Sequence, residues 1–231
     1  RKFKPEEYWT IDAKFIPKGS RKSFSASLYS DANGKIKIEN QEQAEKIEED
    51  LADAEYMITK VKHGTRRKTP APPFITSTLQ QEASRKLGFQ SRRTMKVAQE
   101  LYEGVDIEGM GATGLITYMR TDSLRISDVA KEEAAQYILN RFGEKFLPAK
   151  PRVFKTKSNA QDGHEAIRPS MPSLSPEDVK ASLTSDQFKL YNLIWNRFMA
   201  SQMSDCIQKT TQAEISAKEY IFKASGYYVD F

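Results

Sequence analysis

Apolar and polar positions alternate near both ends of the chain, whereas the middle of the chain follows a helical period. Residues 8–38 concentrate aromatic and β-branched residues around the turn sequences PKGS and DANG, which predicts strands joined by tight turns. Residues 206–231 alternate in the same way. Both ends are therefore expected to form sheet.

An acidic helix and a further strand follow the first sheet segment. Asn40, with Gln43 three residues later, resembles a capping box and opens the amphipathic run QEQAEKIEEDLADA. The sequence EYMITKVKH then returns to a strand pattern. The segment RRKTPAPPF follows, and its three prolines in four positions exclude both helix and strand ladder. We take this segment as the crossing between two domains.

The middle of the chain predicts several helices. The runs TSTLQQEASRKLG and SRRTMKVAQELYEG predict two short helices that end at Gly88 and Gly104. Their close spacing resembles a helix-turn-helix arrangement, which indicates either nucleic-acid binding or ordinary helical packing. Three further runs predict helices, and the last has a strong apolar face: SDVAKEEAAQYILNRFG, SPEDVKASL and SDQFKLYNLIWNRFMASQM.

These patterns predict an α+β fold with one domain inserted into another. A β-rich domain is built from both ends of the chain, residues 1–75 and 205–231, and a mainly helical, helix-turn-helix-like domain covers residues 76–204. The chain begins at Arg1 and stops within an alternating pattern, so we expect it to be a piece of a longer protein. Cys206 is the single cysteine, which excludes an intramolecular disulfide and a cysteine-based zinc site.

Charge is sorted by segment along the chain. The net charge is +5 and the isoelectric point is near 9.1, which by themselves are weak evidence for an anionic partner. Residues 39–55 carry eight acidic residues and one lysine, whereas residues 60–100 carry ten basic and two acidic residues. A solvated helix face explains the acidic run. No apolar run reaches the length that spans a membrane.

The motif GLITYMRTDS places Tyr118 two positions before Arg120. In an extended strand these two side chains would project from the same face. A phenol with a pKa near 10 is a poor nucleophile at neutral pH, but a neighbouring guanidinium favours the phenolate and can hold phosphate oxygens. The pattern therefore predicts phosphoryl-transfer chemistry, with a structural aromatic in a buried strand as the alternative.

A second polar motif, QDGHEAIRPS, contains too few apolar residues for a core segment. If His164 begins a helical turn, Arg168 lies four residues later on the same face, and both can donate to phosphates. The alternative is an ion pair between Glu165 and Arg168 at the surface.

Three long segments occur in the order PFITSTLQQEASRKLGFQSRRTMKVAQELYEG, GLITYMRTDS and QDGHEAIRPS. They closely resemble the signature segments of bacterial type IA DNA topoisomerases, and KPEEYW and FKASG extend the likeness over the whole chain. The resemblance implies that Tyr118 attacks a single-strand phosphodiester, forming a 5′-phosphotyrosine and a free 3′-hydroxyl. It also implies that Arg120 stabilises the scissile phosphate and that His164 binds a neighbouring phosphate.

The same resemblance suggests roles for further residues. Arg168 matches the family motif as a DNA-contacting or site-organising residue. Gln81 and Lys86 match the helix beside the strand-binding groove. Gly163 stands where we expect alanine, a change that keeps the position small but loosens the turn that presents His164.

The resemblance also implies partners and surroundings. The intact enzymes pass one strand through another to relax negative supercoils, so the expected partners are single-stranded and negatively supercoiled DNA in the bacterial cytoplasm, associated with the nucleoid. The β-rich domain corresponds to the family's arch, which swings to open the cleaved strand. Mg²⁺ is implied only through a Toprim domain of the same polypeptide, which no part of this chain matches. We therefore expect no cofactor, metal ligand or membrane contact here, and no activity of the chain by itself.

A different class of function also fits the pattern. A non-catalytic, winged-helix-like module would bind single-stranded DNA electrostatically and use Tyr118 only for stacking. The two functions differ in one measurable product, because only a nucleophile leaves protein covalently attached to the DNA.

Overall fold

The computed structural model describes residues 4–154 and 164–231, and contacts divide the chain into two compact units. Unit 1 consists of Arg1–Lys68 and Cys206–Phe231, and unit 2 consists of Thr69–Asp205. The first division follows Lys68 rather than residue 75, because the strand of unit 1 ends there and Phe74 is buried in the core of unit 2. The second follows Asp205 rather than residue 204.

Unit 1 is built on one antiparallel sheet with the strand order β1-β2-β8-β7-β4, and β3 pairs with β2. Strands from both ends of the chain therefore share one sheet, as the alternating patterns predict. The strands are β1 (Asp12–Phe15), β2 (Phe24–Asp31), β3 (Gly34–Lys35), β4 (Met57–Lys68), β7 (Cys206–Ala217) and β8 (Tyr220–Val229).

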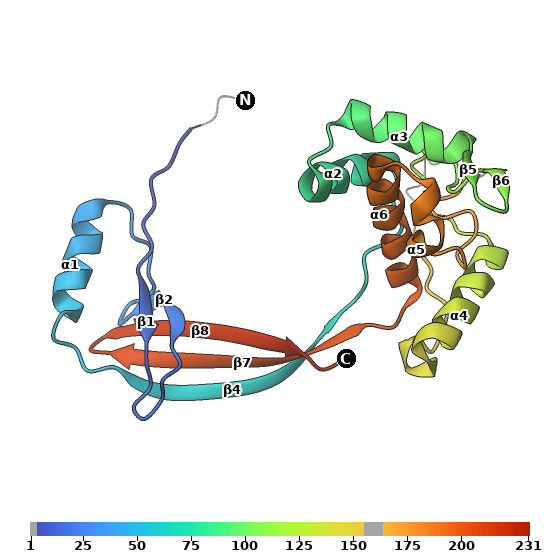
Figure 1. Ribbon diagram of the computed structural model, residues 1–231. Helices are drawn as coiled ribbons and strands as arrows, with labels where there is room; N and C mark the ends of the chain where they lie inside the picture. The colour runs from blue at the N-terminus through green and yellow to red at the C-terminus, as the bar shows by residue number, and fades with distance from the viewer. Residues whose placement is uncertain (1–3, 155–163) are drawn as a thin grey trace. The chain divides into compact units, whose positions relative to one another are not determined.

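The helix α1 (Gln41–Leu51) covers one end of this sheet with the apolar side of its acidic sequence. Its buried residues pack in one cluster with Ile215 and Phe222 of the sheet, while its acidic side chains remain largely exposed. The backbone N–H of Gln43 donates to the Asn40 carboxamide oxygen at 2.9 Å, as the capping pattern predicts. The helix thus covers the sheet where the core of unit 1 lies (Figure 1).

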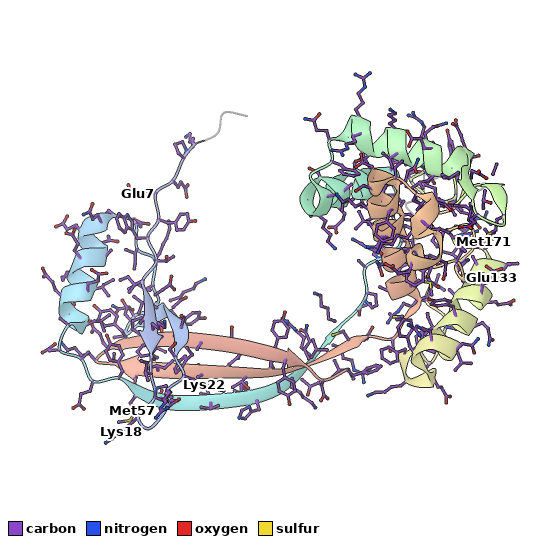
Figure 2. All side chains as sticks on the ribbon, in the orientation of Figure 1. Glu7, Lys18, Lys22, Met57, Glu133 and Met171 are labelled. Atoms are coloured by element: carbon purple, nitrogen blue, oxygen red, sulfur yellow. The ribbon has the colours of Figure 1, made fainter. Side chains whose placement is uncertain are left out.

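Beyond α1, the strands β4, β7 and β8 continue as a ribbon whose side chains project from both faces (Figure 2). Every residue of β4 is exposed, including Met57 at its start. β4 runs antiparallel to β7, and its last residue, Lys68, pairs with Cys206, the first residue of β7. Unit 2 is therefore inserted between two directly paired strand ends.

Unit 2 is mainly helical, so that the two units together form the predicted α+β fold. Gly88 ends α2 in the left-handed conformation at φ 68°, and α3 begins three residues later, which gives the predicted helix pair. The hairpin β5–β6 after α3 was not predicted. The elements are α2 (Thr76–Leu87), α3 (Ser91–Glu103), β5 (Val105–Ile107), β6 (Gly111–Thr113), α4 (Asp128–Phe142), the 3₁₀ turn η1 (Glu144–Phe146), α5 (Pro176–Val179), the 3₁₀ turn η2 (Lys180–Ser182) and α6 (Ser185–Gln202).

In the described part of unit 2, one apolar cluster forms the core. α6 contributes several fully buried side chains to it, including Leu190, Ile194 and Phe198. Such burial is the main stabilising contribution to a domain of this kind. Within the described ranges, none of the helices combines the length and apolar character needed to cross a bilayer.

Candidate active site

The motif around Tyr118 has both buried and exposed side chains. Leu115 and Ile116 are buried, and so is Met119. Tyr118 is 41% exposed and Arg120 is also exposed, on either side of the buried Met119. The exposure of Tyr118 agrees with the expectation that its ring is accessible. The backbone bends at residues 119–120 and is not a strand there, so the face shared with Arg120 stays a prediction.

Backbone hydrogen bonds fix the segment that carries Tyr118. The N–H of Leu115 donates to the carbonyl of Leu101 at 2.7 Å, at the end of α3. On the other side, the N–H of Thr117 donates to Arg168 at 2.9 Å, and the N–H of Ser170 donates to Leu115 at 2.9 Å. The backbone segment that carries Tyr118 is therefore hydrogen-bonded to neighbouring segments on both sides.

The segment 164–170, which carries His164, is extended rather than helical. Ile167 forms an isolated bridge with Phe74, and Pro169 forms one with Ile116. The helical turn that we considered for this segment is wrong, because its backbone bonds to segments distant in sequence instead of to itself. The bridge at Ile116 brings this segment against the Tyr118 motif.

His164 is a neighbour of Tyr118 and lines one pocket with Arg120. Its ring centroid is 6.2 Å from that of Tyr118, with the planes at 52°. It also lines an open pocket of about 500 Å³ together with Arg120. The pocket is lined by Ile75, Thr76, Ser77, Arg120, Thr121, Asp122 and His164. Tyr118, His164 and Arg120 are therefore neighbours on one exposed surface of unit 2.

The pocket has the donors that an anionic group needs. Arg120 supplies a permanent positive charge and several N–H donors, and His164 can donate from its ring. The first residues of α2 also line the pocket, and a helix N-terminus carries partial positive charge. Asp122 is the acidic residue of the lining. This arrangement can hold a phosphate. Tyr118 is not part of the lining, and its ring neighbours the pocket through His164.

Arg168 is 9% exposed, and its guanidinium bonds to protein groups. Its Nε and Nη2 donate to the Glu165 carboxylate at 3.0 and 2.6 Å, Nη1 donates to the Pro169 carbonyl at 2.8 Å, and Nη2 also donates to the Ser127 hydroxyl at 3.3 Å. The predicted pair with Glu165 exists, but it is mostly buried and not a surface pair. These contacts favour the site-organising role over direct contact with DNA.

The two residues predicted on α2 do not line the pocket. Gln81 is exposed, and the Lys86 ammonium lies 3.1 Å from the Glu82 carboxylate, which also contacts Arg197 at 3.4 Å. Their roles beside DNA stay predictions. Gly163 lies outside the described residues.

Sequence reasoning missed two residues that shape the site. Tyr102, at the end of α3, packs its ring 5.4 Å from that of Tyr118. The Thr117 hydroxyl donates to the Ala166 carbonyl at 2.7 Å and accepts from the Arg168 N–H at 3.0 Å, which ties the two motifs together. Thr117 stands inside a motif already singled out, whereas a tyrosine at the end of an amphipathic helix gives no signal of its own.

A family model described as DNA topoisomerase matches residues 1–231, which is the whole chain. The chain belongs to the bacterial type IA DNA topoisomerases. Among solved structures, it resembles full-length topoisomerase I from Thermotoga maritima with a TM-score of 0.77 and 37% sequence identity. The match covers 98% of this chain and 35% of that one. The chain thus corresponds to about a third of that topoisomerase.

The Mg²⁺ that this topoisomerase family implies finds no ligand set in the described part of the chain. Among residues 4–154 and 164–231, no three His, Cys, Asp or Glu side chains form a group that could hold a metal ion. The described residues around Tyr118 therefore do not fit a Mg²⁺ site.

Proposed function

We propose that this chain supplies the nucleophile and part of the phosphate-binding surface of a topoisomerase that cleaves one DNA strand. In the proposed step, the Tyr118 oxygen attacks a backbone phosphorus and loses its proton. The bond from phosphorus to the 3′ oxygen breaks, and that oxygen leaves as a 3′-hydroxyl once it is protonated. The 5′ end remains attached to Tyr118, and the reverse attack rejoins the strand.

One observation carries this proposal most directly. Tyr118 is 41% exposed beside His164, which lines the same pocket as the positively charged Arg120. A phosphate held in that pocket has its developing charge next to fixed donors, which is the main contribution of protein groups to phosphoryl transfer. Of the residues predicted at the site, these three are the ones whose placement supports direct contact with the substrate.

The finer parts of the proposal rest on the family likeness. The substrate is single-stranded or negatively supercoiled DNA, and the product of the complete cycle is relaxed DNA. The remaining acid–base and metal groups come from the Toprim domain of the same polypeptide. The sheet of unit 1 corresponds to the arch that opens the cleaved strand.

The test is Tyr118→Phe in the full-length enzyme. The phenylalanine has no oxygen to attack phosphorus, so covalent cleavage should be abolished. Single-strand affinity should fall by no more than about tenfold, because one hydroxyl contributes about 0.5 to 1.5 kcal/mol to binding. A labelled oligonucleotide resolved on a denaturing gel measures the covalent product, and fluorescence anisotropy measures the affinity.

Tyr228→Phe is the matched control, because Tyr228 is an exposed tyrosine of unit 1 at 64%. It should cleave like the parent enzyme. Cleavage that survives in the Tyr118→Phe variant would show that another residue is the nucleophile. If the parent enzyme binds DNA but never forms a covalent product, the function is that of the non-catalytic binding module.

A further inference from the structure

The Tyr118 ring is packed against a second exposed tyrosine. The ring centroids of Tyr102 and Tyr118 are 5.4 Å apart, and their planes meet at 64° in an edge-to-face arrangement. Each of the two residues is 41% exposed. His164 packs on the Tyr118 ring as well, at 6.2 Å. The candidate nucleophile is therefore flanked by two aromatic rings.

The backbone is built so that Tyr102 reaches this position. Gly104 ends α3, and the β5–β6 hairpin then returns the chain so that Val105 pairs with Thr113. The next residue, Gly114, passes so close to the helix end that an added Cβ atom would lie 2.8 Å from the carbonyl oxygen of Tyr102. Glycine therefore permits the approach that sets Tyr102 beside the Tyr118 motif.

This contact limits the freedom of a side chain that would otherwise stand loosely on the surface. The buried Met119 and the backbone bonds of the segment fix the Cα atom of Tyr118, but its exposed ring can still rotate about χ1 and χ2. An edge-to-face partner favours one ring orientation. A nucleophile reacts efficiently only when its oxygen is held in line with the phosphorus, and small displacements lower the rate strongly.

We propose that Tyr102 is a positioning residue for Tyr118, which orients the phenol for attack by packing its ring against the nucleophile. This inference rests on the proposed function of Tyr118. Tyr102 touches the nucleophile rather than the reacting phosphate, so its removal should slow cleavage without weakening the binding of DNA. An exposed aromatic ring that stacks on a base would instead contribute to affinity.

The experiment compares Tyr102→Leu and Tyr102→Phe in the full-length enzyme, using one single-stranded oligonucleotide. Tyr102→Leu keeps an apolar side chain but removes the ring, and it should lower the single-turnover cleavage rate about tenfold at saturating DNA while the Kd stays within twofold. Tyr102→Phe keeps the ring and should restore the rate to within about twofold of the parent. Tyr102→Met serves as a second ring-less variant, and thermal melting establishes that each variant is folded.

The alternatives give different results. If Tyr102→Leu and Tyr102→Met cleave at the parent rate, the inference is wrong. If they bind more weakly and saturating DNA restores the rate, Tyr102 is a base-stacking residue and the inference is also wrong. Tyr118→Phe is assayed alongside. Cleavage by that variant overturns the proposed function itself, whereas its inactivity together with unaffected Tyr102 variants overturns only this inference.

Discussion

Arg168 and Arg120 show two different uses of an arginine within one site. Arg168 is buried, and its nitrogens bond to Glu165, Pro169 and Ser127. Arg120 is exposed and lines the pocket beside His164. A buried guanidinium with protein partners holds neighbouring segments in place, whereas an exposed one is available to a phosphate.

Replacing these arginines should therefore have opposite consequences. Arg168→Ala should lower the free energy of unfolding by about 3 kcal/mol, because it leaves the Glu165 carboxylate buried without its partner. It should not change the slope of log affinity against log salt concentration for single-stranded DNA. Urea unfolding measures the first quantity, and anisotropy at several salt concentrations measures the second.

Arg120→Ala is the matched comparison. It should reduce the magnitude of the salt slope by about 0.7, the value for one lost phosphate contact on a single strand. Its effect on stability should stay within about 0.5 kcal/mol, because the side chain is exposed. A reduced salt slope in Arg168→Ala instead would make Arg168 a DNA-contacting residue.

For single residues, the sequence predicted the exposure of those side chains whose environment follows from a local pattern. The exposed Tyr118 and Arg120 follow from alternation about Met119. The contact with Tyr102 could not be predicted, because it depends on how the β5–β6 hairpin returns the chain to the end of α3. Extended backbone at residues 164–170 was missed for the same reason, since its partners are distant in sequence.

Among the elements of unit 2, α2 and α6 are joined by an ion pair that involves one carboxylate of α2. Glu82 of α2 contacts Lys86 at 3.1 Å and Arg197 of α6 at 3.4 Å. The Lys86 ammonium, followed by Arg197 and Arg85, holds the pKa of Glu82 below its usual value of 4.5. The Arg197 guanidinium also lies over the Phe74 ring, 4.4 Å from its centroid. Arg197 therefore contacts both α2 and the segment at the start of unit 2.

Glu82→Gln should lower the stability of unit 2 in a pH-dependent way. Because folding depresses the pKa of Glu82, its carboxylate stabilises the fold above the unfolded pKa near 4.5, and this contribution is lost as the pH falls through the lower folded pKa. The variant should be less stable by about 1 kcal/mol at pH 7, in the range of a well-placed ion pair. The difference should shrink as the pH falls below 4.5 through the lower folded pKa, as measured by urea unfolding at pH 7 and at acidic pH.

Glu133→Gln provides the comparison, because Glu133 is exposed on α4 (Figure 2). It should leave stability unchanged at both pH values. Equal stability of the Glu82 variant and the parent at pH 7 would show that the ion pair between α2 and α6 does not contribute to the free energy of unfolding.

Elements with long periodic patterns were predictable, and short or irregular ones were not. The helices α2 and α3 end at the predicted glycines. The strands β5 and β6 have three residues each, too few for a period to be recognised. β4 was predicted to end before the basic residues that precede the prolines, yet it continues to Lys68 because β7 pairs with it along its length.

For the whole chain, the change of period between the ends and the middle was enough to predict an inserted helical domain. Each unit has its own apolar cluster, so the fold of each unit can be explained from its own buried residues. The exact boundaries could not be predicted, because the proline segment has no period and its place is decided by the burial of Phe74.

The 231-residue chain by itself should neither relax supercoiled DNA nor cleave an oligonucleotide, with or without Mg²⁺. It corresponds to 35% of the Thermotoga maritima enzyme, so most of that enzyme has no counterpart in it. In the proposed function, protonation of the departing 3′ oxygen also needs groups from outside this chain. Gel assays of relaxation and covalent cleavage, with the full-length enzyme in parallel, measure both outcomes. Relaxation by the chain alone would contradict this expectation.

The pairing of Lys68 with Cys206 determines how mechanical tension passes between the units. Both connections leave from this one paired strand end, so a pull on unit 2 draws β4 and β7 in the same direction and does not make them slide past each other. A pull directed along the strands is instead resisted between β7 and β8, where it is shared by many hydrogen bonds at once. A load along the strands therefore shears the sheet, so that its hydrogen bonds yield together rather than one after another.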